Sequence, residues 1–114
     1  MANEVEIVTV EVPRPRYPFV PETIPTDEPV SVHFVVGEEV LLFGTGYASG
    51  AFELIRAIDR IGGLDVVIVE HGDPDHYDSV PILKELYDDL SVAVPADDAG
   101  VLESNGIEAD VLLE

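Results

Sequence analysis

The stretch that decides the fold is Val66-Val67-Ile68-Val69, followed one residue later by His71-Gly72-Asp73-Pro74-Asp75-His76. The unbroken apolar run predicts a strand that is buried on both faces of a sheet. A helix signal begins directly after the polar run, at Asp78 and Ser79. Two imidazoles and several carboxylates are therefore expected in one loop at the carboxyl end of an inner strand, where open α/β sheets place their ligands.

This loop has the donor chemistry of a metal site. Neutral imidazole nitrogen and carboxylate oxygen are both ligands of zinc-like cations. The alternative is a solvated acidic turn, because the acidic composition of the chain is enough to explain Asp73, Asp75 and Asp78. Composition does not explain why His71 and His76, two of only three histidines, lie five residues apart in the same loop. The sequence favours the metal site.

Outward from this loop, strand-like and helix-like patterns alternate and predict a single α/β domain over residues 1–114. Residues 12–29 hold six of the nine prolines and predict an irregular connection. Ser49 is the expected N-cap of the first helix, and Gly62-Gly63 is its expected end. Strands are expected at 4–10, 30–36, 40–43, 66–69, 92–94 and 111–113, and helices at 51–61, 80–90 and 96–103.

The alternation of side chains predicts which residues share a face of the first strands. In the first strand, Val5, Ile7 and Thr9 form one side, which predicts a half-buried strand. The second and third strands are joined by a short turn at residues 37–39 and are expected to form an antiparallel hairpin. One face of the second strand is expected to carry Val30, Val32, Phe34 and Val36.

The charge of the chain is extreme for its size. Twenty-four Asp and Glu residues face five Lys and Arg residues, which gives a net charge of −19. Such a charge destabilises a compact chain by self-repulsion, and about 1 M salt, with a Debye length of roughly 3 Å, removes most of that repulsion. The composition therefore predicts a halophilic protein with a solvated acidic surface. It argues against nucleic-acid binding, which needs clustered Lys and Arg.

The composition also excludes several other classes. The absence of cysteine rules out disulfides and thiolate zinc sites. No run approaches the ~18 apolar residues of a membrane span. Residues 1–13 lack the basic and apolar regions of a secretory signal, so the protein is expected in the cytoplasm, with no membrane partner.

The order of these elements resembles the amino-terminal half of the metallo-β-lactamase fold superfamily. The resemblance implies half of an αββα sandwich, with a mixed sheet that carries helices on one face. It also implies a metal-dependent hydrolase that cleaves an ester, thioester or amide of a small-molecule substrate with a metal-bound water. Three stretches carry the resemblance: 32–36, the turn at 41–46, and the loop at 71–76, which is similar to a His-x-His-x-Asp-His metal motif.

Carried over by resemblance, His71 matches a ligand of the first metal position. Asp75 and His76 match ligands of the second, and Asp75 also matches the catalytic residue that orients the water. Asp73 stands where the family has its second histidine, and this harder oxygen ligand shifts preference from Zn²⁺ towards Mn²⁺, Mg²⁺ or Fe²⁺ while still permitting zinc. Gly44 stands where the family usually has an aspartate.

Neither metal position is complete in one copy, because the family's other ligands come from its carboxyl-terminal half. The resemblance therefore implies a truncated domain that is inactive alone, and the alternative function is a non-catalytic half-domain or assembly module. One sheet face would lack a cover, so a homodimer or pairing with a second polypeptide is expected. The residues expected on that open face are Val5, Ile7, Val30, Val32, Phe34 and Val40.

A second alternative is a Rossmann-like dinucleotide binder. Gly44-x-Gly46-x-x-x-Gly50 follows a strand and opens a helix, and Glu70 ends the next strand. The glycine spacing differs from the usual fingerprint, and ordinary turn geometry also explains it. The third histidine, His33, is expected to be an ordinary strand residue, facing away from its apolar neighbours.

Overall fold

The structure of the chain is a computed structural model, and it describes residues 5–12, 30–70 and 74–113. Residues 1–4, 13–29, 71–73 and 114 lie outside that description, as do the side chains of residues 74 and 75. Much of the proline-rich connection predicted at 12–29 and half of the polar loop at 71–76 therefore lie outside the described residues. Within the described part, no helix has the length and apolar character needed to cross a bilayer.

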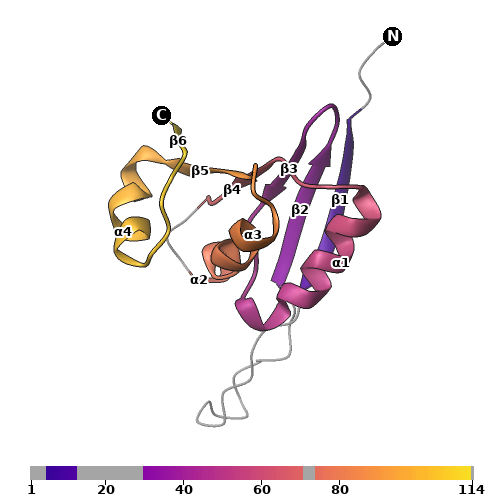
Figure 1. The fold of residues 1–114 in the computed structure, drawn as a ribbon, viewed down its shortest axis with the longest axis horizontal. Helices are drawn as coiled ribbons and strands as arrows, with labels where there is room; N and C mark the ends of the chain where they lie inside the picture. Colours follow the sequence, from indigo (N-terminus) through magenta and orange to yellow (C-terminus); the bar gives the residue numbers. More distant parts are fainter. Residues whose placement is uncertain (1–4, 13–29, 71–73, 114) are drawn as a thin grey trace.

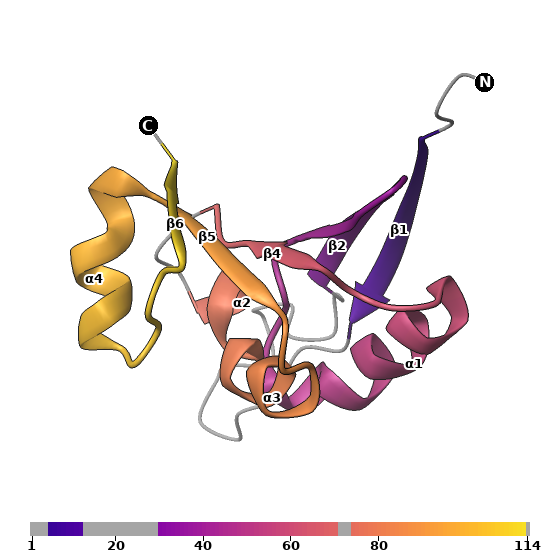
Figure 2. The same ribbon diagram turned by 45° about the horizontal axis from the view of Figure 1, so that its top comes forward.

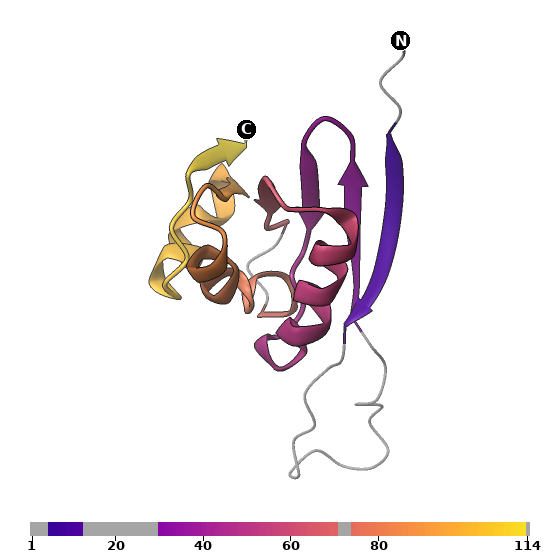
Figure 3. The same ribbon diagram turned by 45° about the vertical axis from the view of Figure 1, so that its right-hand side comes forward.

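The described strands form one six-stranded mixed sheet whose spatial order follows the sequence (Figure 1). Strands β1, β2 and β3 pair in antiparallel fashion, and β3, β4, β5 and β6 pair in parallel. Figure 3 shows β1 at one end of the sheet and β6, near the carboxyl terminus, at the other. The strands are β1 Glu6–Val12, β2 Val30–Val36, β3 Val40–Phe43, β4 Val66–Ile68, β5 Ser91–Pro95 and β6 Val111–Leu113.

The parallel strands are joined by crossovers that contain the helices. Because each crossover steps to the next strand in the same direction, right-handed connections place the helices on one face of the sheet. Figure 2 shows α1 and α3 on the same side of the sheet. This arrangement confirms the predicted mixed sheet with helices on one face. The helices are α1 Ala51–Ile61, α2 Pro74–Tyr77, α3 Val80–Leu86 and α4 Ala99–Ser104.

The hydrophobic core lies between this helix layer and the sheet. Helix α1 buries Leu54, Ala57 and Ile58, which recur at helical spacing, and α3 buries Leu83. The burial of these side chains supplies most of the driving force for docking the helices. Strands β1 to β5 contribute alternate residues to the core, of which the fully buried ones are Val12, Val32, Phe34, Leu42, Val67, Val92 and Val94.

The register corrects the predicted faces of β1 and β2. Val10 pairs with Val32, and Val8 pairs with Phe34, so these residues share the helix-covered face. Val32 and Phe34 are fully buried there, and the expectation that they line the open face is wrong. Ile7 lies on the opposite side of β1 and is 71% exposed. Strand β1 also continues to Val12, which the prediction had assigned to the proline-rich connection.

Several element boundaries also differ from prediction. Ser49 lies inside a short 3-10 turn, and Gly50 takes the N-cap position of α1 without a side-chain hydrogen bond. Gly62 ends α1 in the left-handed conformation, as expected. Helix α3 stops at Leu86, which is exposed, because the backbone becomes extended at Tyr87. The predicted helix at 96–103 divides into a 3-10 turn and α4, and α2 was not predicted.

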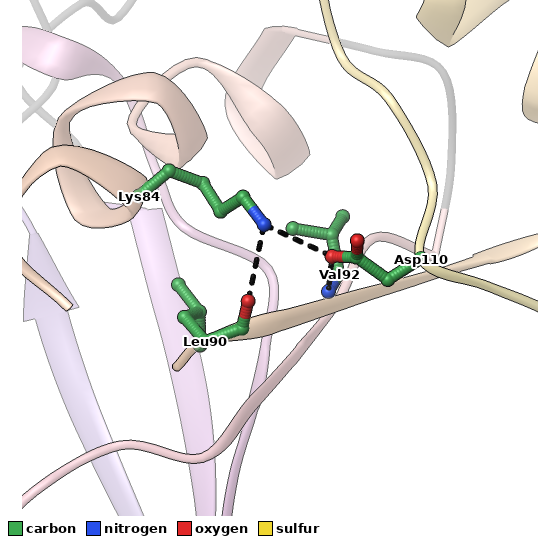
Figure 4. A network of polar contacts seen from close by, with 4 residues as sticks. All are labelled: Lys84, Leu90, Val92 and Asp110. Atoms are coloured by element: carbon green, nitrogen blue, oxygen red, sulfur yellow. Dashed lines mark hydrogen bonds and ion pairs between the residues drawn. The ribbon is translucent and has the colours of Figure 1, made fainter. Parts of the chain in front are cut away.

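A polar network fastens β6 to the rest of the sheet at its amino-terminal end (Figure 4). The Asp110 carboxylate accepts hydrogen bonds from the Val92 backbone N–H at 2.8 Å and from Lys84 Nζ at 3.0 Å. These two donors lower the pKa of the Asp110 carboxyl below its ordinary value. Lys84 also donates to the Leu90 carbonyl oxygen at 3.1 Å, so the chain's one lysine links α3 to the residues that directly precede β5 and β6.

The other face of the sheet carries no helix among the described residues. Two rows of side chains run across its full width. The residues in these rows are apolar, uncharged polar or histidine. Parallel sheets are normally covered on both faces, so this face is unusual. We call it the open face. Its two full rows are formed by Ile7, Thr9, His33, Val35, Leu41, Phe43, Val66, Ile68, Ser91, Ala93 and Val111, and a partial third row by Glu11, Ser31, Pro95 and Leu113.

Candidate metal centre

The candidate site lies where β3 and β4 end side by side. Gly44 follows β3 and Glu70 lies two residues beyond β4, and the two strands are parallel. The Gly44 N–H donates to the Ile68 carbonyl oxygen at 3.0 Å and so continues the ladder past the last paired residue of β3. The predicted position of the polar loop, at the carboxyl end of an inner strand, is confirmed. Val67 and Val69 are fully buried, whereas Val66 and Ile68 are only half-buried on the open face.

Backbone hydrogen bonds tie the turn at 44–46 to the segment that follows the polar loop. The Thr45 N–H donates to the His76 carbonyl oxygen at 3.1 Å. The buried Thr45 hydroxyl accepts from the Ser79 N–H at 3.1 Å and donates to the Gly46 carbonyl oxygen at 3.0 Å. Further along, the Ala48 N–H donates to Asp78 Oδ2 at 2.7 Å. These bonds hold the carboxyl-terminal end of the polar loop against the turn at 44–46.

The glycines of this turn are explained by its geometry. Gly46 has a φ of +69°, and a Cβ at this position would lie 3.1 Å from Val12 Cγ1. A side chain there would meet both backbone strain and the core end of β1. The strand order also runs from β1 to β6 without reversal, so the described sheet has no switch point of the dinucleotide-binding kind. The Rossmann-like alternative is not supported by this sheet.

His76 is the ligand candidate whose side chain the structure describes. Its Nδ1 lies 3.5 Å from Glu70 Oε1, and the two side chains are 26% and 38% exposed. Gly44 lies against both: a Cβ on Gly44 would be 3.2 Å from Glu70 Oε1 and 3.5 Å from His76 Nδ1. A carboxylate therefore faces one nitrogen of the imidazole, an arrangement that is common behind metal-bound histidines.

The remaining predicted ligands have different outcomes. His71 and Asp73 lie outside the described residues, and Asp75 lies in α2 with its side chain outside them. Among the residues that the structure does describe, no three His, Asp or Glu side chains are grouped closely enough to hold a metal ion. His33 is an exposed β2 residue whose Nδ1 lies 3.0 Å from Thr9 Oγ1, as expected of an ordinary strand residue.

Two residues of this site were not predicted from sequence. The sequence indicated only that Thr45 belongs to the turn at 41–46, whereas its hydroxyl is buried and doubly hydrogen-bonded. Glu70 had a predicted role only in the dinucleotide-binding alternative, as the acidic residue at the end of a strand. A signal for Glu70 was present, because it is the one charged residue between the buried run at 66–69 and His71.

Replacing Thr45 tests how firmly the turn is held. Thr45→Val keeps the shape but leaves the buried Ser79 N–H without its acceptor, so we expect a loss of about 1–3 kcal/mol in the free energy of unfolding. Thr45→Ser keeps the hydroxyl and should cost less than about 1 kcal/mol, roughly one buried methyl group. Urea unfolding in molar KCl measures both. Equal losses in the two variants would contradict the role of the hydroxyl.

Comparison with known proteins shows which solved structures have a similar fold. No protein-family model matches the chain, and no curated protein matches it in sequence. Solved structures do match: a metallo-β-lactamase from Cronobacter sakazakii, with a TM-score of 0.67, 14% identity, and coverage of 75% of this chain and 40% of that one. A class B3 di-zinc metallo-β-lactamase from an Alaskan soil metagenome matches with a TM-score of 0.65 and 17% identity, and the match covers 73% of this chain and 39% of that one. The metallo-β-lactamase from Hirschia baltica matches with a TM-score of 0.62 and 15% identity, and the match covers 96% of this chain and 48% of that one.

The chain therefore has the metallo-β-lactamase fold over part of that fold, its amino-terminal half. At these identities the likeness concerns the fold alone. The chain spans less than half the length of the solved structures that it matches. The fold predicted from the three motifs is confirmed.

Proposed function

We propose that the loop at the carboxyl end of β4 binds a divalent cation and belongs to the site of a metal-dependent hydrolase. The observation that carries this proposal is the described part of the loop: His76, with a carboxylate at Nδ1, at the carboxyl ends of two parallel strands. The likeness to metallo-β-lactamases, one of which is a di-zinc enzyme, supports the same chemistry.

The donors fit such a cation. His71 and Asp73 would hold it at the first metal position and Asp75 and His76 at the second, with Zn²⁺ or the harder Mn²⁺ and Fe²⁺ as candidates. When bound, the cation supplies Lewis acidity and lowers the pKa of a coordinated water to about 7, which suits hydrolysis of an ester, thioester or amide of a small molecule. Asp75 would orient that water, and the backbone bond from Thr45 to the His76 carbonyl would hold the loop.

Calorimetric titration with Zn²⁺ and with Mn²⁺ in molar KCl tests the proposal. We expect weak binding, because a catalytic metal needs about three protein ligands and each position has fewer. His76→Ala should weaken the binding at least about tenfold, the loss of one ligand. His33→Ala removes a histidine from the open face and should leave binding unchanged. Tight binding that survives His76→Ala would refute the assignment of this loop.

A second candidate function, an assembly module, is favoured by the open face. Glu11, at the end of β1, is the one acidic residue among the described residues that form this face. In the whole chain, 24 of the 114 residues are Asp or Glu. Apart from Glu11, this face is therefore uncharged in a chain that carries many acidic residues elsewhere. We propose that the face is an interface and that a second copy of this chain covers it.

The chemistry of the face points to a second copy. It offers apolar side chains rather than charges, so it suits a surface of the same kind, and a second copy presents that surface with two-fold symmetry. Six strands at ~4.8 Å spacing and three rows of side chains give roughly 400–500 Å² per copy. Two copies then bury about 800–1,000 Å², near the lower limit of a specific interface. Two sheets pack face to face in this way about 10 Å apart.

A further inference from the structure

The space above Gly44 is shared by two groups that matter for the candidate site. A Cβ at this position would lie 3.2 Å from Glu70 Oε1, closer than ordinary van der Waals contact, and 3.5 Å from His76 Nδ1. Gly44 also has a φ of +78°, which disfavours other residues. The glycine therefore leaves the room that the Glu70 carboxylate enters to reach the imidazole.

The backbone fixes both partners of this contact. The Gly44 N–H binds the Ile68 carbonyl oxygen, two residues before Glu70, at 3.0 Å. The Thr45 N–H binds the carbonyl oxygen of His76 itself at 3.1 Å. The turn at 44–46 thus holds the end of β4 and helix α2 at a set separation, and the carboxylate and the imidazole meet above it.

The contact influences which nitrogen of the His76 imidazole carries the proton. In neutral imidazole one nitrogen carries the proton and the other accepts or binds a cation. A carboxylate at Nδ1 favours the proton on Nδ1, which leaves Nε2 as the ligand atom. At 3.5 Å between partly exposed groups the contact adds little to stability, so its effect is on orientation and tautomer.

We propose that Glu70 is a positioning residue for His76: its carboxylate, admitted by Gly44, holds the imidazole with Nε2 directed to the cation. The part of this inference that concerns the metal rests on the proposed function. The coupling between the Glu70 and His76 side chains does not depend on it. The Glu70 carboxylate thus lies where a side chain at position 44 would otherwise be.

The test compares Glu70→Ala with Glu53→Ala. Both remove one carboxylate, but Glu53 is an exposed residue in the first turn of α1. Two-dimensional ¹⁵N–¹H NMR of the metal-free chain in molar KCl, above the pH at which imidazole is protonated, reports the His76 tautomer. Calorimetry with Zn²⁺ reports affinity. We expect Glu70→Ala to shift the tautomer and weaken Zn²⁺ binding by about 10–100-fold, and Glu53→Ala to do neither.

Glu70→Gln keeps an amide oxygen at the same place and should give an intermediate result, which separates positioning from simple loss of charge. A His76 tautomer unchanged in Glu70→Ala would overturn the proposal. A tautomer shift in a chain that binds no Zn²⁺ would support the coupling and refute the proposed metal function. Circular dichroism confirms that each variant is folded.

Discussion

Transfer from about 1 M to about 0.01 M KCl is expected to unfold the chain. Over this range the Debye length grows from roughly 3 Å to roughly 30 Å. The radius of gyration is 14.5 Å, so at low salt each carboxylate repels others across the whole molecule, whereas at high salt it repels only its nearest neighbours. With a net charge of −19, this repulsion opposes a stability that is ordinarily only about 5–15 kcal/mol.

Circular dichroism during stepwise dilution of KCl measures this transition. A variant that combines Glu38→Gln, Glu39→Gln, Asp88→Asn and Asp89→Asn provides the control. It removes four of the nineteen net negative charges at exposed turns, so it should unfold at lower salt than the unchanged chain. Stability that does not depend on KCl, or an unchanged midpoint in this variant, would contradict the self-repulsion argument and with it the prediction of a halophilic protein.

Light scattering in molar KCl is expected to give twice the 12.3 kDa mass of one chain. Phe43→Lys should convert this dimer to a monomer, because Phe43 pairs with His33 and Ile68 in the middle of the open face. Each copy would then bring an unpaired charge into an interface that excludes water, which costs several kcal/mol. An interface of only about 800–1,000 Å² does not withstand that loss.

Phe52→Lys is the matched control for this experiment. It makes the same chemical change and the same change in net charge, but Phe52 is 69% exposed on α1, on the helix side of the sheet. This variant should remain a dimer. A monomeric unchanged chain would overturn the second copy as the occupant of the open face, and equal dissociation of both variants would show that the interface lies elsewhere. We expect the dimer to show no esterase activity, because each copy brings the same incomplete ligand set.

Elements with one apolar stripe could be predicted from sequence. Helix α1 was predicted with its observed bounds because Leu54, Ile55, Ile58 and Ile61 recur at helical spacing before a glycine pair. The β2–β3 hairpin was predicted for a similar reason: one face alternates regularly and a short turn separates the strands. The unbroken apolar run at 66–69 predicted a buried strand, and the polar loop was therefore placed at the end of β4. Local pattern and chemistry suffice in these cases.

Strand β1 shows where pattern alone is insufficient. Both of its sides are apolar, Val5 and Ile7 on one and Val8, Val10 and Val12 on the other. A period of two residues cannot decide which side is buried. That choice depends on the crossovers from β3 to β6, which place α1 over the face that carries Val12, Val32 and Phe34. The same choice leaves the face of Ile7 open.

The sequence by itself determined the fold class, the acidic surface and the position of His76, because each follows from local periodicity, composition or spacing. Only the tertiary structure decided that Glu70 faces His76 and that Gly44 makes room for it, because those three residues come from the ends of two strands and a helix. Their meeting depends on the parallel pairing of β3 with β4 and on the backbone bond from Thr45 to His76. Such contacts depend on long-range packing, which no window of the sequence contains.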